Sequence, residues 1–258
     1  MEPRDAATVL LCRDAPQLEV FLLQRNLGSV FAAGAHVFPG GAVDDEDDLA
    51  APRVRAMPPG PAEVPDRFLV AAIREAFEEA GVLLARDTRT GAPVDTARLA
   101  AARDALRRGR RTFPELVDEL GVRLDLDALT PMARFVTPPG APRRYDTWFF
   151  VAAAPAGHQY RHDEDETVAS VWMRPDVALG ADRRGEVWLV EPTRWTLEAI
   201  AAFARSDDLL RAARVAWAAH PSPVTAHDAR RGWVLPLARA SRAPVAGVGA
   251  ARRRKTPA

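Results

Sequence analysis

The sequence predicts one α/β domain in which helices pack on both faces of a mixed β-sheet, with helical additions. Hydrophobic residues make up 48% of the 258 residues, which is enough for a sizeable core. Short runs rich in Val, Leu and Phe, typical of strands, are interspersed with longer amphipathic segments. These elements lack a regular strand–helix–strand order, so a mixed sheet is favoured over a purely parallel one.

The first 81 residues predict three strands and a helix. Residues 8–12 and 18–23 are apolar runs separated by a turn at Asp14–Pro16, and residues 34–41 predict a third strand that ends in a glycine loop. Residues 44–65 are acidic and then rich in proline, which predicts a surface insertion. Asp66 is then a good N-cap, and Gly81 is a good C-terminal stop for a helix.

The rest of the chain predicts further helices around two long strands. One or two helices are expected near 95–121, closed by Gly121. Strands are expected at 146–153, 168–173 and 186–190, a helical extension at 192–220, and a flexible tail at 237–258.

Composition excludes several classes of function. Lys+Arg and Asp+Glu number 35 each, so no overall field recruits nucleic acid or an anionic membrane. Cys12 is the single cysteine, which excludes a disulfide framework and a zinc site built from cysteines. With no signal peptide and no run of about 18 apolar residues, we expect a cytoplasmic protein. A homodimer is compatible with the sequence.

The segment Arg74–Val82 carries the chemistry that the sequence indicates most clearly. Positions i, i+3 and i+4 share a helical face, so Glu75, Glu78 and Glu79 project together, with Arg74 one turn before Glu78. Converging carboxylates repel each other, and a hard divalent cation such as Mg²⁺ relieves the repulsion. The alternative is a solvated acidic helix face.

A glycine loop upstream favours the metal site over the solvated face. The residues 38–41 read Phe-Pro-Gly-Gly, and paired glycines let backbone amides and carbonyls approach an ion or a phosphate closely.

These residues together resemble the Nudix hydrolase family. The family's motif is Gly, five residues, Glu, seven residues, and then Arg-Glu-apolar-x-Glu-Glu-x-Gly-apolar, and Arg74–Val82 fits every fixed position of the second half. Gly41 and Asp47 fit the first half, with 19 extra residues before Arg74. A rival register, Gly60 and Asp66, has the standard spacing but lacks the Pro-Gly-Gly loop, so the register with the insertion is preferred.

The upstream residues are similar to the signature of the coenzyme A diphosphatase group within that family. They are Leu22–Arg25 and Gly34–Gly41, followed by Asp44 and Asp47. The resemblance makes Arg25 a candidate for substrate binding. Arg143 and Arg144 precede a strand and are further candidates, because Arg binds phosphate bidentately; a solvated turn is the alternative for them.

The resemblance implies an α/β/α sandwich whose core spans about residues 5–180 and a metal-dependent hydrolase of a nucleotide-type diphosphate. Mg²⁺ or Mn²⁺ would be held by Glu75, Glu78, Glu79 and the Gly40 carbonyl. Either Glu75, positioned by Arg74, or Glu166 would take the proton from water, unless Glu166 is merely solvated. Substrate alternatives to coenzyme A or acyl-CoA are ADP-ribose, NADH and other nucleotide derivatives. A non-catalytic nucleotide sensor is the alternative outside enzymes.

Overall fold

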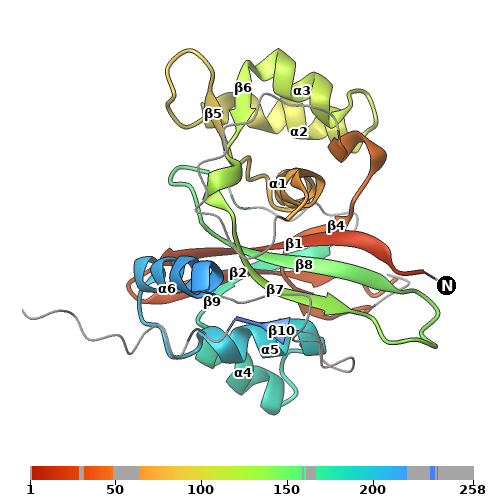
Figure 1. The fold of residues 1–258 in the computed structure, drawn as a ribbon, viewed down its shortest axis with the longest axis vertical. Coiled ribbons are helices and arrows are strands. Elements are labelled where there is room, and N and C mark those ends of the chain that lie inside the picture. The colour runs from red at the N-terminus through yellow and green to blue at the C-terminus, as the bar shows by residue number, and fades with distance from the viewer. Residues whose placement is uncertain are drawn as a thin grey trace, which may run out of the picture.

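An eight-stranded mixed sheet forms the middle layer of the described structure, and helices lie on both sides of it (Figure 1). The computed structural model describes residues 2–28, 32–48, 64–158, 160, 167–219, 233–235 and 237. The strands are β1 (Arg4–Asp14), β2 (Leu18–Arg25), β3 (His36–Val37), β4 (Gly40–Ala42), β7 (Thr130–Val136), β8 (Tyr145–Ala153), β9 (Thr167–Met173) and β10 (Trp233–Val234). The predicted α/β/α sandwich around a mixed sheet is confirmed.

The strand order places β1 at the centre of the sheet. The order is β10-β7-β8-β1-β2-β3, with β4 pairing β1 and β9 pairing β2. Only the β1–β8 pair is parallel among the strand pairs of the described residues. The middle of β1 is buried, because helices cover both faces of the sheet there.

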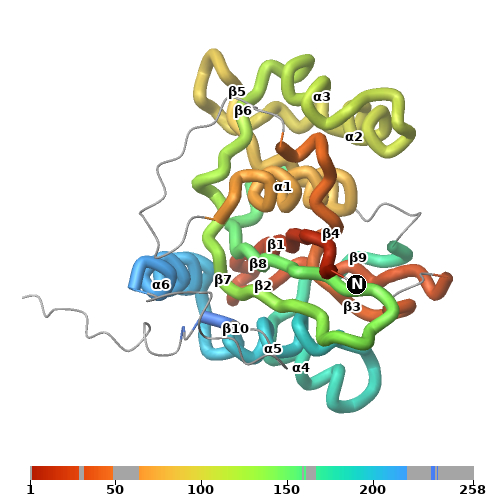
Figure 2. Tube along the Cα trace, turned by 45° about the vertical axis from the view of Figure 1, so that its right-hand side comes forward, coloured from red at the N-terminus to blue at the C-terminus, as the bar shows by residue number. Residues whose placement is uncertain are grey.

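The upper layer in Figure 1 is built around α1 (Asp66–Ala80), which lies between the sheet and a small helical unit. That unit contains α2 (Leu99–Arg107) and α3 (Phe113–Leu120), preceded by the 3₁₀ turn η2 (Thr96–Arg98). The short strands β5 (Ala85–Asp87) and β6 (Val122–Leu124) pair beside it. Covered from both sides (Figure 2), α1 is buried around almost its whole circumference.

The other face of the sheet is covered by α4 (Pro175–Arg183) and α5 (Glu191–Ile200), while α6 (Ser206–Ala219) packs beside β7 and β8. Trp217 of α6 is 1% exposed, and its ring centroid lies 6.2 Å from that of Trp148 on β8. The predicted C-terminal helices therefore share the main hydrophobic core.

The ends of α1 are set by local backbone chemistry. Pro65 occupies the N-cap position, and Asp66 is the first helical residue rather than the cap that the sequence predicted. Gly81 ends the helix with φ 71°, a left-handed conformation that glycine adopts without a steric penalty. The glutamates of the motif thus occupy the last two turns of α1.

Four of the strands predicted from the sequence are present in the structure, and one predicted strand does not form. The strands predicted at 8–12, 18–23, 146–153 and 168–173 lie within β1, β2, β8 and β9 apart from small shifts of their ends. Residues 186–190 form no strand; the Leu189 N–H donates instead to the carboxylate of Asp182 at 3.0 Å, and Leu189 makes only an isolated bridge with His36. The sequence did not predict β7 or α4.

The segments predicted to be peripheral are only partly described. The 3₁₀ turn η1 (Asp45–Asp48) begins the acidic insertion, Val64 near its end is buried, and residues 49–63 lie outside the described residues. Leu237, where the flexible tail was predicted to begin, is 1% exposed, and residues 238–258 also lie outside. Within the described part of the chain, no helix has the length and apolar character needed to cross a membrane.

Candidate active site

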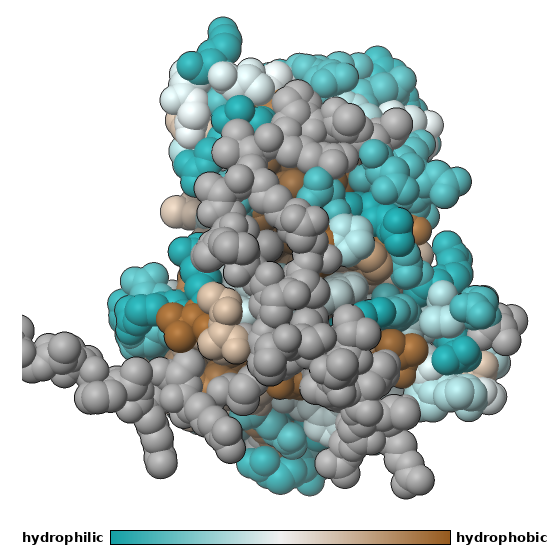
Figure 3. Space-filling model, in the orientation of Figure 1, coloured by the Kyte–Doolittle hydropathy of each residue, from teal (hydrophilic) through white to brown (hydrophobic). Residues whose placement is uncertain are grey.

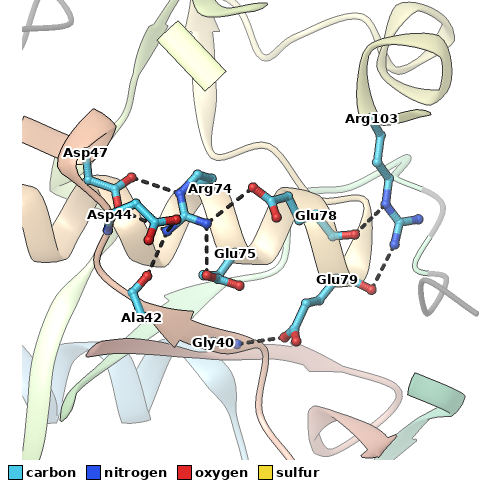
Figure 4. A network of polar contacts seen from close by, with 9 residues as sticks. All are labelled: Gly40, Ala42, Asp44, Asp47, Arg74, Glu75, Glu78, Glu79 and Arg103. Atoms are coloured by element: carbon cyan, nitrogen blue, oxygen red, sulfur yellow. Dashed lines mark hydrogen bonds and ion pairs between the residues drawn. The ribbon is translucent and has the colours of Figure 1, made fainter. Parts of the chain in front are cut away.

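Three carboxylates project from the C-terminal half of α1 beside β4 (Figure 4). Glu79 is 5% exposed, the Glu75 side chain is 12% exposed and the Glu78 side chain is 29% exposed. The helical spacing that placed them on one face is therefore realised against the sheet and not in open solvent. The alternative of a fully solvated acidic face is wrong.

Arg74 is the hub of this group. Its guanidinium donates to Asp47 through Nε and Nη2, each at 2.9 Å, and Nη2 also donates to the Ala42 carbonyl at 2.9 Å. Nη1 donates to Glu75 at 2.9 Å and to Glu78 at 3.3 Å. Such a planar, multidentate arrangement suits arginine and not lysine.

The partner of Arg74 supports the register with the insertion. Asp47 in η1 is 1% exposed and also accepts the backbone N–H of Asp44 at 2.8 Å. Asp66, the acid of the rival register, is instead the first residue of α1. The fold therefore brings Gly41, Asp47 and Arg74 together, although the insertion separates Asp47 from Arg74 in the sequence. The insertion begins in the site itself.

The two glycines of β4 lie against the carboxylates and β1. The Gly40 N–H donates to Oε2 of Glu79 at 2.8 Å. A Cβ atom at Gly40 would lie 2.5 Å from the Ala7 carbonyl oxygen, and one at Gly41 would lie 2.7 Å from Cδ of Glu75. Only glycine allows this approach. The Gly40 carbonyl as a metal ligand stays a prediction.

This contact predicts the effect of Gly41→Ala. The added methyl group overlaps the Glu75 carboxylate, which must move, so we expect kcat to fall by about 10-fold and stability by about 1–3 kcal/mol. Steady-state kinetics and urea unfolding measure the two effects. Gly28→Ala is the matched control, since a Cβ there meets nothing closer than 3.6 Å. Equal kinetics for both variants would contradict the close packing of Gly41 on Glu75.

Burial and repulsion between like charges shift the pKa values of the ionisable groups in the site. Burial, with a smaller contribution from the Glu78 charge, raises the pKa of Glu75 to about 7, although Arg74 opposes the shift. Burial likewise raises the pKa of Glu78. Burial disfavours the charge of Arg74, yet its hydrogen bond to Asp47 and the surrounding carboxylates raise its pKa overall. The carboxylates carry more negative charge than one guanidinium balances.

The donor set fits a hard divalent cation. Carboxylate oxygens are the ligands that Mg²⁺ and Mn²⁺ prefer, and buried, like-charged carboxylates gain most from such an ion. Among the described residues, no three side chains already converge in a finished metal site. Glu75 and Glu78 turn toward Arg74, and Glu79 turns toward Gly40.

The other predicted site residues lie on β2, in the connection before β8, or outside the described residues. Arg25 is the last residue of β2, and its backbone N–H donates to the Ala35 carbonyl at 2.9 Å. Arg143 is exposed between β7 and β8, and Nε of Arg144 donates to the Thr137 carbonyl at 3.0 Å. Glu166 is outside the described residues. The roles of these four residues stay predictions.

One residue of the network was missed by sequence reasoning. Arg103 of α2 donates to the backbone carbonyls of Glu78 and Glu79, each at 2.9 Å (Figure 4). No local pattern marks it, because it lies 25 residues from Glu78 and is surrounded by alanines typical of any helix.

Comparison with known proteins decides the family. Residues 53–200 match the family described as the NUDT19 Nudix domain, which is more than half of the chain. This chain belongs to the Nudix hydrolase family. Its fold agrees: a Nudix hydrolase structure from Alicyclobacillus acidocaldarius superposes with a TM-score of 0.66 at 29% identity, covering 82% of this chain and 96% of that one.

Two curated relatives of this Nudix hydrolase are named acyl-coenzyme A diphosphatase NUDT19. The Gallus gallus protein is 31% identical over 80% of this chain and 70% of its own length. The Homo sapiens protein is 31% identical over 76% of this chain and 64% of its own length, so this chain spans about two thirds of each relative. Nudix hydrolases act on small nucleotide derivatives and generally use divalent metals.

Proposed function

We propose that this Nudix hydrolase cleaves the diphosphate bond of coenzyme A or an acyl-CoA, with Mg²⁺ or Mn²⁺ as its metal. The observation that carries the proposal is the 31% identity to an acyl-coenzyme A diphosphatase over 80% of the chain. The buried carboxylates of α1 beside the glycines of β4 supply a site of matching chemistry.

The proposed metal ligands are Glu75, Glu78 and Glu79, together with the Gly40 carbonyl. A divalent cation held there would neutralise diphosphate charge and lower the pKa of bound water. Water attacks one phosphorus, the P–O–P bond breaks, and the departing phosphate takes the bridging oxygen. Glu75 is a candidate base for the proton of that water, because its largely buried carboxylate lies in the proposed site and is held there by Arg74. Glu166 is the other candidate.

Arg74 supports this chemistry by orienting carboxylates. It contacts Glu75 and Glu78 directly and is itself fixed by buried Asp47. Because these bonds restrict the side chains, the carboxylates lose less conformational freedom when a cation or substrate arrives. Arg74 is therefore a positioning residue in the proposed mechanism.

Coenzyme A has a 3′-phosphate on its ribose, and that group distinguishes it from similar diphosphates. If Arg25, Arg143 or Arg144 binds it, a charge-assisted contact of about 1.5–3 kcal/mol should favour coenzyme A over dephospho-coenzyme A by on the order of 10-fold or more. We expect kcat/KM to rank coenzyme A above dephospho-coenzyme A, ADP-ribose and NADH. Higher kcat/KM for ADP-ribose or NADH would contradict the proposed substrate and leave the family assignment intact.

Single replacements identify the arginine responsible. Arg25→Met, Arg143→Met and Arg144→Met are compared by the ratio of kcat/KM for coenzyme A to that for dephospho-coenzyme A. The variant whose ratio falls to about 1 has lost the residue that binds the 3′-phosphate.

A further inference from the structure

The last turn of α1 has backbone carbonyls that the helix itself cannot satisfy. The chain leaves the helix at Gly81, and the Val82 N–H donates to the Ala76 carbonyl at 3.1 Å. The carbonyls of Glu78 and Glu79 therefore have no following helical N–H to accept from. Both belong to residues whose side chains form the candidate metal site.

Arg103 supplies the missing donors from a different part of the fold. It lies on α2, in the helical unit that covers α1, and its guanidinium donates to the Glu78 and Glu79 carbonyls at 2.9 Å each. Figure 4 shows the guanidinium at the end of α1, on the side away from β4. A cation at a helix C-terminus also offsets the negative end of the helix dipole.

The two carbonyls that Arg103 contacts belong to proposed metal ligands, which connects this contact with metal binding. Glu78 and Glu79 carry anionic side chains in the last turn, where the helix dipole disfavours negative charge. Arg103 binds the backbone of these same two residues, so it both fixes the turn and compensates the unfavourable dipole. Its own charge repels a cation, but the guanidinium faces the carbonyls and not β4.

We propose that Arg103 is a positioning residue that holds the last turn of α1 so that Glu78 and Glu79 bind the divalent metal. The proposal rests on the metal site of the proposed function and adds a residue outside the Nudix motif. It also gives the α2–α3 unit a role in activity. In the view of Figure 3, the surface of that unit is largely hydrophilic.

The test measures Mn²⁺ binding to the full chain by electron paramagnetic resonance of free Mn²⁺. Arg103→Met should raise the Kd for Mn²⁺ by about 3- to 10-fold, a range set by the net contribution of one hydrogen bond in a folded protein. The Mg²⁺ concentration for half-maximal activity should rise by the same factor. At saturating Mg²⁺, kcat should return to within about threefold of wild type, because all the carboxylates remain. Arg103→Lys keeps a positive charge and a donor but loses the two-pronged guanidinium, so its Kd for Mn²⁺ should lie between those of wild type and Arg103→Met.

Arg98→Met is the matched control. Arg98 also donates to two carbonyls at a helix end, those of Glu119 and Leu120 of α3 at 3.1 Å each, but that turn carries no proposed metal ligand. It should lower the melting temperature by no more than Arg103→Met does, because Arg98 is exposed, and it should leave the Kd for Mn²⁺ unchanged. If Arg103→Met does not fold, Arg103→Gln replaces it in the same comparison.

The outcomes separate this proposal from the one on which it rests. Equal Mn²⁺ affinity in the Arg103 and Arg98 variants, or tighter binding without Arg103, would overturn the positioning role. Glu78→Gln serves as the reference for the metal site. If Glu78→Gln binds Mn²⁺ as tightly as wild type does, the proposed metal site itself is wrong.

Discussion

Glu78→Gln and Glu79→Gln should each lower kcat by about 10²-fold or more. The substitutions keep side-chain size and helix propensity, but they remove a charged oxygen ligand from the proposed metal site. A metal contributes several kcal/mol of transition-state stabilisation, and a factor of 10² corresponds to only about 2.7 kcal/mol. Steady-state kinetics with coenzyme A at saturating Mg²⁺ provide the measurement.

Glu198→Gln is the control, because Glu198 is exposed on α5, on the other side of the sheet. Its kcat should match wild type. Glu78→Gln and Glu79→Gln should fold, since removing one of several neighbouring negative charges relieves repulsion, and Glu198→Gln should fold because Glu198 is exposed. Activity within about threefold of wild type for Glu78→Gln and Glu79→Gln would assign the two residues a minor role.

Asp47→Ala should lower the free energy of unfolding by about 3 kcal/mol, because it leaves the buried guanidinium of Arg74 without its bidentate partner. Asp47 is 1% exposed, and the Arg74 side chain is 7% exposed, so water cannot replace the lost bonds fully. The remaining contacts to Glu75 and Glu78 keep the loss at the lower end of the usual range. The midpoint of urea unfolding measures the change.

Glu46→Ala tests whether this loss is specific to the pair. Glu46 lies in the same 3₁₀ turn but is exposed, so its replacement should change stability by less than about 0.5 kcal/mol. The same series tests the register of the Nudix motif. A larger loss for Asp66→Ala than for Asp47→Ala would favour the rival register.

The parts of the fold that depend on local chemistry could be predicted from the sequence. The helix from Asp66 to about Gly81 follows from a proline before it, a glycine after it and the periodicity between them. The same periodicity places Glu75, Glu78 and Glu79 on one face. Family resemblance supplies their chemistry, since an acidic helix face by itself is compatible with a solvated surface.

Contacts between distant segments could not be predicted in this way. Asp47 reaches Arg74 across 27 residues, and the resemblance predicted its place in the motif without showing its burial. Arg103 had no sequence signal. Residues 186–190 are mostly apolar, like a short buried strand, yet the carboxylate of Asp182 accepts the backbone N–H of Leu189, so contacts outside the segment decide the conformation there.

Product analysis by mass spectrometry tests metal-dependent diphosphate cleavage most directly. Coenzyme A incubated with the protein and Mg²⁺ should yield adenosine 3′,5′-bisphosphate and 4′-phosphopantetheine in equal amounts. EDTA should abolish both products, and added Mg²⁺ or Mn²⁺ should restore them. Undiminished turnover in EDTA, or dephospho-coenzyme A and inorganic phosphate as the products, would contradict a metal-dependent diphosphatase.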